Sequence, residues 1–223
     1  MEDKQEMQKE ITGQKRMKVV FIRTNVLFPG QILSFELDKN NDVLRLMEDA
    51  RAKNEDILVI AEKNPNKEGA APDDAYSEGT TARITQILRL PNDSGRAVVR
   101  GGERMKTLEY VAVAPFEAVV EPFGTELTDD AESRALIKLI QEECASALSS
   151  AVKLNKDIIS QASVESIDRL ICELAYFLFL KDSERQELLE IADKKQQLEA
   201  IYKKLIASRE VLDAEKRISQ RVK

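Results

Sequence analysis

Residues 116–131 read FEAVVEPFGTELTDDA, and they contain the last proline and the last glycine of the chain, Pro122 and Gly124. All six prolines and all eight glycines lie within residues 1–124, and the remaining 99 residues contain neither. Turns and strand ends use Gly and Pro, whereas long helices exclude both. The sequence therefore predicts an α+β protein of two domains, a β-rich domain at residues 1–124 and an all-helical domain at residues 125–223.

The first domain is expected to be built mainly from β-strands. Its β-branched and aromatic runs are separated by turn signals such as Pro29-Gly30 and the five-residue loop Pro91–Gly95. The double glycine Gly101-Gly102 lies within a strand pattern and is interpreted as a β-bulge. Strands are predicted at residues 17–23, 31–37, 56–62, 80–90, 96–108 and 110–121, with one helix at 41–53. Six strands and one short helix predict a small mixed barrel that is filled by side chains.

The second domain is expected to begin with two helices. Thr128-Asp129-Asp130 is a cap signal for a helix from Ala131 to about Asn155, and Ser163 is a cap signal for a second helix over residues 164–180. The end of the second helix, residues 174–180, is apolar on every side. Such a segment must be buried on more than one side.

A third helix is predicted to run without a break from Asp182 or Ser183 to about Val222, a length of about 60 Å. Apolar residues recur along it every seven positions, and the last turns carry no Gly or Pro stop, so the helix is expected to continue beyond Lys223. A heptad seam indicates self-association or coupling to a neighbouring domain. The alternative is that the seam packs only on the two preceding helices. The seam residues are Ile191, Leu198, Leu205 and Leu212.

The composition excludes most catalytic chemistry. The chain has no histidine, so a Ser-His-Asp or Cys-His site cannot form. Cys144 and Cys172 are distant in sequence and flanked by apolar residues, which indicates buried thiols rather than a zinc site, a disulfide framework or a redox pair. Neither GxxxxGK[ST] nor GxGxxG occurs. This chain by itself is therefore predicted not to be an enzyme and to bind no metal or other cofactor.

The charge and hydropathy patterns limit the partners. Residues 1–124 carry 18 Lys and Arg against 21 Asp and Glu, and residues 125–223 carry 16 against 19, so neither half is basic enough to indicate nucleic-acid binding. No apolar run approaches the length needed to cross a bilayer. The charged start, MEDKQEMQKE, does not resemble a secretory signal. The expected location is the cytoplasm.

Several ordered motifs carry a resemblance to a known family. They are RTNVLFPG (23–30), ILVIAEK (57–63), EGTTARI (78–84), LRLP (88–91), VVRGGER (98–104), RQELLEIADKKQQL (185–198) and DAEKRISQRVK (213–223). In this order and spacing they resemble the N-terminal region of the Lon ATP-dependent proteases. The resemblance covers residues 17–223. It implies a pseudo-barrel related to the RNA-binding PUA architecture, followed by a helical bundle and a long helix.

The resemblance also implies a function. The N-terminal region of a Lon protease recognises unfolded, damaged or regulatory proteins and delivers them to a hexameric motor and protease. The Walker motifs and the Ser-Lys dyad of the family have no matching positions here, so ATP and magnesium belong to the motor of the full-length protein. This chain alone is expected to be a monomer or a weak dimer.

Substrate contacts are expected at apolar side chains near turns, because exposed apolar groups are what unfolded chains share. The candidates are Leu27, Phe28, Pro29, Leu90, Pro91 and Met105. The alternative, which the sequence favours for Leu27, Phe28 and Leu90, is that these side chains close the core of the barrel.

A second class of function remains open at the level of sequence. The chain could be a freestanding PUA-like module that binds RNA or acts as a protein adaptor. The acidic balance and the lack of a basic groove with stacking aromatics argue against RNA.

Overall fold

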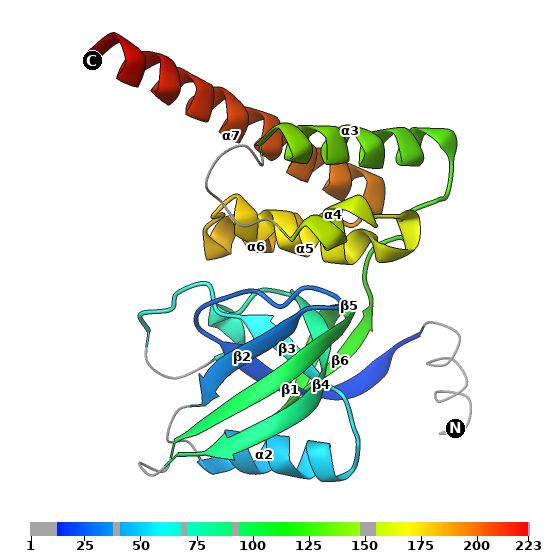
Figure 1. Cartoon of the computed structure of the whole chain (residues 1–223). Helices are drawn as coiled ribbons and strands as arrows, with labels where there is room; N and C mark the ends of the chain where they lie inside the picture. The colour runs from blue at the N-terminus through cyan, green and yellow to red at the C-terminus, as the bar shows by residue number, and fades with distance from the viewer. Residues whose placement is uncertain (1–12, 38–40, 68–70, 91–93, 148–154, 223) are drawn as a thin grey trace. The chain divides into compact units, whose positions relative to one another are not determined.

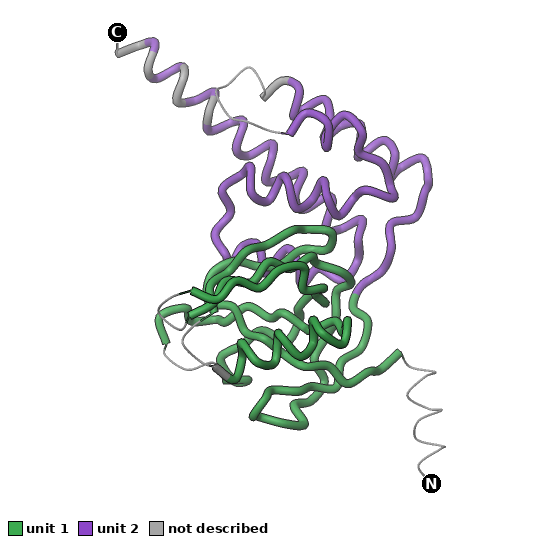
Figure 2. The backbone as a smooth tube through the Cα atoms, turned by 60° about the horizontal axis from the view of Figure 1, so that its bottom comes forward, with its two compact units in different colours: residues 1–123 green, residues 124–223 purple. Residues whose placement is uncertain are grey.

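The protein, for which we describe a computed structural model, has two compact units, Met1–Phe123 and Gly124–Lys223 (Figure 2). The structure describes residues 13–37, 41–67, 71–90, 94–147 and 155–222. The division between the units falls one residue before the boundary expected from the last proline and glycine. Strands lie in the first unit and helices dominate the second, so the fold is α+β (Figure 1).

The strands of the first unit form one mixed sheet with the order β2-β5-β4-β3-β1-β6. Strand β5 pairs with β6 as well, so β5, β4, β3, β1 and β6 form a closed ring of strands to which β2 is attached. Only β1 and β3 are parallel among the pairs in the described residues. The elements are β1 (Lys15–Ile22), β2 (Ile32–Leu37), α2 (Asn41–Ala52), β3 (Ile57–Ala61), the 3-10 turn η1 (Pro72–Asp74), β4 (Glu78–Arg89), β5 (Gly95–Val113) and β6 (Phe116–Pro122).

The ring closes because β5 is long enough to pair with β2 through its first residues and with β6 through its last residues. Its first residues, from Gly95 to Arg100, pair with β2, and residues from Met105 to Val113 pair with β6. The strand directions follow from these pairings. Since β1 is parallel to β3, and β3–β4, β4–β5 and β5–β2 are each antiparallel, β1 and β2 run in opposite directions.

The double glycine forms the predicted bulge in β5. Thr80 pairs with Arg104 and Ala82 pairs with Gly101, so two residues of β5 face Thr81 alone. The bulge removes the Glu103 N–H from the strand ladder. This N–H donates instead to the Thr81 hydroxyl at 2.8 Å. The bulge also brings the backbone of the Val26–Gly30 loop close to β5. A Cβ atom on Gly101 would lie 2.1 Å from the Phe28 carbonyl oxygen.

The last strand was predicted too long, and the preceding one too short. Residues 110–113 belong to β5, and the chain turns at Ala114-Pro115 before β6 begins at Phe116. Proline cannot donate to a strand ladder, so Pro115 marks a turn. Residues 110–113 continue the apolar pattern of the following strand. For this reason the sequence was interpreted as one strand with no turn at Pro115.

The first unit has a core cluster to which β1, β3, β5 and β6 contribute. Strand β3 is buried along its whole length, as its continuous apolar run predicts. Helix α2 contacts β4. The buried cluster contains Met17, Val19, Leu58, Ile60, Ala75, Met105, Ala118 and Val120, with Phe21, Tyr76, Tyr110 and Phe116 packed against it.

The second unit is built from short helices and one long helix. They are α3 (Ala131–Ala147), α4 (Lys156–Ser160), the 3-10 turn η2 (Val164–Ser166), α5 (Ile167–Phe177), α6 (Asp182–Leu189) and α7 (Lys194–Val222). Asp130 caps α3 by accepting the Ser133 N–H at 2.7 Å, as the sequence predicts. Asn155 does not end the first helix, because its side chain accepts the Asp157 N–H and caps α4. Residues 148–154 lie outside the described part.

The predicted third helix is two helices, α6 and α7. Gln197 donates its side-chain amide to the Leu188 carbonyl at 2.8 Å, and Asp193 accepts the Gln196 N–H at 2.8 Å. Asp193 is therefore the N-cap of α7, and Asp193-Lys194-Lys195-Gln196 matches the spacing of a capping box, a signal that the heptad pattern obscured. The continuous helix is α7 alone, which is about 43 Å long.

The apolar segment 174–180 is only partly buried. Leu174 and Ala175 are fully buried, but α5 ends at Phe177 and the Phe179 side chain is 78% exposed. Phe179 has a φ of 51°, the left-handed conformation of a residue just after a helix. The chain leaves the helix before Phe179, and for this residue the prediction that the segment is buried on more than one side is wrong.

The approach of Phe28 to Gly101 yields a prediction. Gly101→Ala would force its Cβ into the Phe28 carbonyl, so we expect it to lower the free energy of unfolding by at least about 2 kcal/mol. Denaturant titration followed by circular dichroism measures this change. Arg100→Ala, at the exposed neighbouring position, is the control and is expected to stay within about 0.5 kcal/mol of the parent chain. Equal stability of the two variants would contradict the prediction.

Candidate functional site

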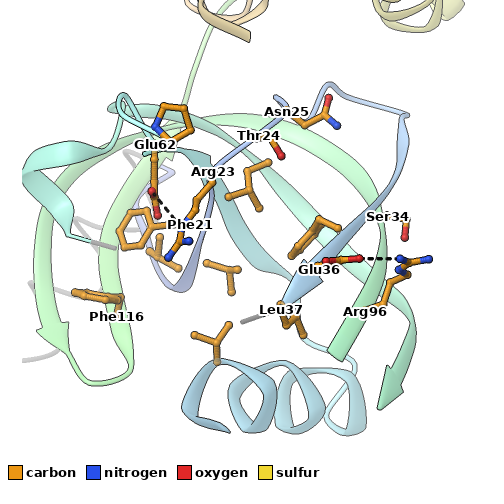
Figure 3. Close-up of a pocket in the computed structure, with 16 residues that line it drawn as sticks. Phe21, Arg23, Thr24, Asn25, Ser34, Glu36, Leu37, Glu62, Arg96 and Phe116 are labelled. Carbon is orange, nitrogen blue, oxygen red and sulfur yellow. Dashed lines mark hydrogen bonds and ion pairs between the residues drawn. The ribbon is translucent and has the colours of Figure 1, made fainter. Parts of the chain in front are cut away.

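A cleft of about 950 Å³ opens in the first unit between β1 and β2, and we call it the β1–β2 cleft (Figure 3). Its walls are residues 19–25, from β1 and the turn after it, and residues 34–37 of β2. Val43 of α2 and Phe116 of β6 complete its apolar lining, and Glu62, Pro65 and Arg96 also border it. The cleft lies where the end of β1 and one side of β2 have no paired strand among the described residues.

The two walls of the cleft are edges of the sheet. Strand β2 pairs with β5 on one side, and no strand of the described residues pairs with its other side. Strand β1 pairs with β6 only through Lys15–Lys18, so from Val19 to Ile22 it has β3 on one side and the cleft on the other. An unpaired edge presents backbone N–H and C=O groups that can bind another extended chain.

Charged groups flank the cleft as pairs of opposite sign. Arg23 lies 4.0 Å from Glu62 on the β1 side, and Arg96 lies 2.9 Å from Glu36 on the β2 side. Figure 3 shows the two pairs on opposite walls, with apolar side chains between them. Their charges sum to zero, so these four groups give the site no preference for an acidic or a basic ligand.

The predicted substrate-binding side chains do not form an exposed patch. Leu27, Phe28 and Met105 are at most 2% exposed, and Pro29 is buried as well. The Thr80 hydroxyl donates to the Leu27 carbonyl at 2.6 Å, and the Gly30 N–H donates to the Gly101 carbonyl at 3.0 Å. The Val26–Gly30 loop is therefore a structural element that closes the unit. The expectation that turn chemistry exposes these side chains is wrong, and the alternative of a core role describes them.

The remaining two candidates, Leu90 and Pro91, follow β4 in the sequence. Leu90 is partly exposed, and its N–H donates to the Ser94 carbonyl at 2.9 Å. Pro91 lies outside the described residues. The structure does not bring Leu90 together with Leu27, Phe28, Pro29 and Met105 in a common surface, because those four are buried.

The predicted heptad seam is mainly a core feature of the second unit. Leu198 and Leu205 are at most 2% exposed, and α7 contacts α3, α5 and α6. Ile191 is half-buried and precedes α7, in the connection after α6. The side chain of Leu212 lies outside the described part. Farther along α7, Val211 and Ile218 are about 60% exposed.

The two thiols are unsuited to chemistry near neutral pH. Burial raises the pKa of Cys144 to about 11 and that of Cys172 to about 12. Both groups therefore stay protonated, and a thiol is a weak nucleophile. Within the described ranges, no three His, Cys, Asp or Glu side chains lie together in a way that could hold a metal ion.

The cleft was not found from the sequence. The alternation in residues 31–37 predicts a half-buried strand, but it does not show which edge of that strand is free. Pairing partners come from contacts between residues far apart in the chain, such as Leu33 with Val99. The turn residues Arg23, Thr24 and Asn25 do stand in the quoted motif at 23–30, which was the one available signal.

The chain belongs to the family of ATP-dependent protease La (Lon) substrate-binding domains, whose model matches residues 16–206. The Lon protease of Bacillus thuringiensis (strain Al Hakam) is 28% identical over 95% of this chain and 27% of its own length. The Lon protease of Azospirillum brasilense is 31% identical over 91% of this chain and 25% of its own length. The chain spans about a quarter of the length of these curated relatives.

Solved structures show the same fold. The N-terminal domain of Mycobacterium avium complex Lon protease superposes with a TM-score of 0.63 at 20% identity, covering 86% of this chain and 98% of that one. A Lon N-terminal domain protein from Xanthomonas campestris gives a TM-score of 0.58 at 15% identity, covering 84% of this chain and 97% of that one. None of the helices in the described part of this chain is both long and apolar enough to cross a membrane.

The burial of the seam yields a prediction about the second unit. Leu198→Ala removes a fully buried side chain from α7, so we expect the helical unit to lose about 2–5 kcal/mol of unfolding free energy. Val211→Ala, at an exposed position of the same helix, is the control and is expected to change stability by less than about 0.5 kcal/mol. Denaturant titration followed at 222 nm in circular dichroism compares them. A Leu198→Ala variant as stable as the control would show that the seam is not part of this core.

The thiol environments yield a second prediction. Because burial raises the pKa of Cys144 from 9.0 to about 11, the reactive thiolate at pH 8 becomes about 100-fold rarer in the folded chain. Alkylation of the folded chain by iodoacetamide, followed by mass spectrometry, is expected to be slower than alkylation of the chain in urea by at least that factor. Rapid modification of Cys144 in the folded chain would contradict its burial.

Proposed function

We propose that this chain is the substrate-recognition region of an ATP-dependent Lon protease and that it binds unfolded or damaged proteins. The observation that carries the proposal is the β1–β2 cleft, in which apolar side chains and two unpaired strand edges lie together in a member of a substrate-binding family. Unfolded proteins expose both apolar side chains and unpaired backbone, whereas folded proteins bury them.

Catalysis would reside elsewhere in the full-length protein. The relatives are proteases about four times as long as the region they share with this chain. We place ATP hydrolysis, magnesium binding and peptide-bond cleavage in the part of such a protein that this chain does not match. The role of this chain is then to capture a substrate, to hold it, and to assist assembly of the hexamer in the cytoplasm. Regulatory proteins with exposed segments would be captured in the same way.

The freestanding module remains the alternative proposal. It would bind RNA or a protein partner without any protease. Against RNA stands the mixed charge around the cleft, where Arg23 and Arg96 are each matched by a carboxylate. A binding surface for a phosphate backbone needs an excess of positive charge.

The proposal is tested by comparing one protein in two states. Labelled lactalbumin in its native, disulfide-bonded form and labelled lactalbumin that has been reduced and carboxymethylated are titrated with the full 223-residue chain, and fluorescence anisotropy is measured. We expect binding of the unfolded form that is at least about tenfold tighter, because only that form offers free backbone and apolar groups.

A single-stranded RNA of mixed sequence is the control. Binding to RNA but not to unfolded protein would overturn the proposal and support the freestanding module. Binding to neither would also overturn it and leave the helical unit as a structural assembly element. Sedimentation of the chain alone is expected to show a monomer or a weak dimer, and a stable hexamer would contradict that expectation.

A further inference from the structure

The outer edge of β2 carries backbone groups that β5 does not use. The Gly101 N–H donates to the Gln31 carbonyl at 2.8 Å, and the same register pairs Leu33 with Val99 and Phe35 with Ala97. Residues of an antiparallel pair alternate between those that bond across the pair and those that point away from it. The N–H and C=O groups of Ser34 and Glu36 therefore point away from β5, toward the free edge.

The opposite wall of the cleft has the same property. The Glu62 N–H donates to the Ile22 carbonyl at 2.9 Å, which continues the parallel ladder between β1 and β3. By the same alternation, Val20 and Ile22 bond toward β3, whereas Val19 and Phe21 direct their N–H and C=O groups to the other side. Strand β6 pairs as far as Lys18, so the groups of Phe21, which lie beyond that ladder, face the cleft.

The chemistry of the cleft is thus that of a gap between two strands. Backbone hydrogen bonds are formed by any extended polypeptide, whatever its sequence, and a folded protein has almost none of them to offer. The flanking charges are paired, so they impose no selection by charge. Val43, Phe35 and Phe116 provide apolar contacts to the side chains of an inserted strand. The occupant that fits all these features is an extended segment of an unfolded protein.

We propose that the β1–β2 cleft binds an extended segment of an unfolded protein as an additional β-strand, hydrogen-bonded to the outer edge of β2. This inference rests on the proposed function and specifies how the same region recognises its substrate. Main-chain pairing supplies affinity that does not depend on sequence, and the apolar lining adds a preference for segments rich in β-branched and aromatic residues.

A proline at the edge tests the backbone contribution directly. Ser34→Pro removes an N–H that points to the cleft and places the ring in the path of an added strand, while the β5 ladder keeps its bonds through Leu33 and Phe35. We expect the affinity for reduced, carboxymethylated lactalbumin to fall at least about tenfold. Ser34→Ala retains the N–H and is the matched control, so its affinity should equal that of the parent chain. Circular dichroism and thermal unfolding verify that both variants are folded.

Hydrogen exchange of the parent chain gives a second measurement that needs no variant. In the free chain, the amides of Ser34 and Glu36 are expected to exchange faster than those of Leu33 and Phe35, which β5 protects. Saturation with the same unfolded lactalbumin should slow exchange at Ser34 and Glu36 at least about tenfold, as resolved by two-dimensional nuclear magnetic resonance.

The outcomes separate this inference from the proposed function. If the parent chain binds unfolded lactalbumin, but Ser34→Pro binds equally well and the amides of Ser34 and Glu36 are not protected, strand addition at β2 is wrong while substrate recognition stands. If the parent chain does not bind the unfolded form at all, the proposed function fails first. Loss of binding in Ser34→Pro alone, together with protection of the two amides in the parent chain, supports strand addition.

Discussion

The first unit depends on the contact between the Phe28 carbonyl and Gly101. The bulge at Gly101–Glu103 bends β5, and the absence of a side chain at Gly101 lets the Val26–Gly30 loop approach the strand. Two hydrogen bonds then hold the loop: the Thr80 hydroxyl donates to the Leu27 carbonyl, and the Gly30 N–H donates to the Gly101 carbonyl. With the loop held there, the chain enters β2 beside β5, and the other edge of β2 is left facing the β1–β2 cleft. One backbone contact therefore fixes both the closure of the core and the position of the candidate site.

The same contact explains why a turn motif can be mistaken for a binding motif. A sequence such as Val26-Leu27-Phe28-Pro29-Gly30 has the composition of an exposed apolar turn, and Pro-Gly turns usually lie at the surface. Here the partner of the turn is 71 residues further along the chain, at Gly101, and no local pattern reveals that pairing. The apolar residues predicted to contact substrate are buried in the core. The groups available for binding are largely backbone atoms, which are the same for any amino-acid composition and cannot be recognised from it.

Local signals predicted the elements well where a single strong cap or breaker decides them. Asp130 and the Gly101-Gly102 pair act as expected. Ser163 lies at the start of the 3-10 turn η2, and the predicted second helix begins only at Ile167. Errors arose where two signals competed. The heptad pattern from Ile191 to Leu212 predicted one continuous helix, so the cap at Asp193 was not recognised. The apolar run after Tyr110 predicted one continuous strand, so the turn at Pro115 was not recognised. The number of strands was enough to predict a closed sheet. Its free edges could not be predicted, because they depend on which strands lack a paired neighbour.

The opposite directions of β1 and β2 have a consequence for how a bound chain is oriented. A segment lying between them is parallel to one wall and antiparallel to the other, whichever way it runs. Reversing the segment exchanges the two kinds of pairing and keeps one of each. Both kinds of ladder are stable in proteins, with only a slight difference per residue. For a chain bound there as we propose, the polarity is therefore weakly specified, and either its amino or its carboxyl end can lead.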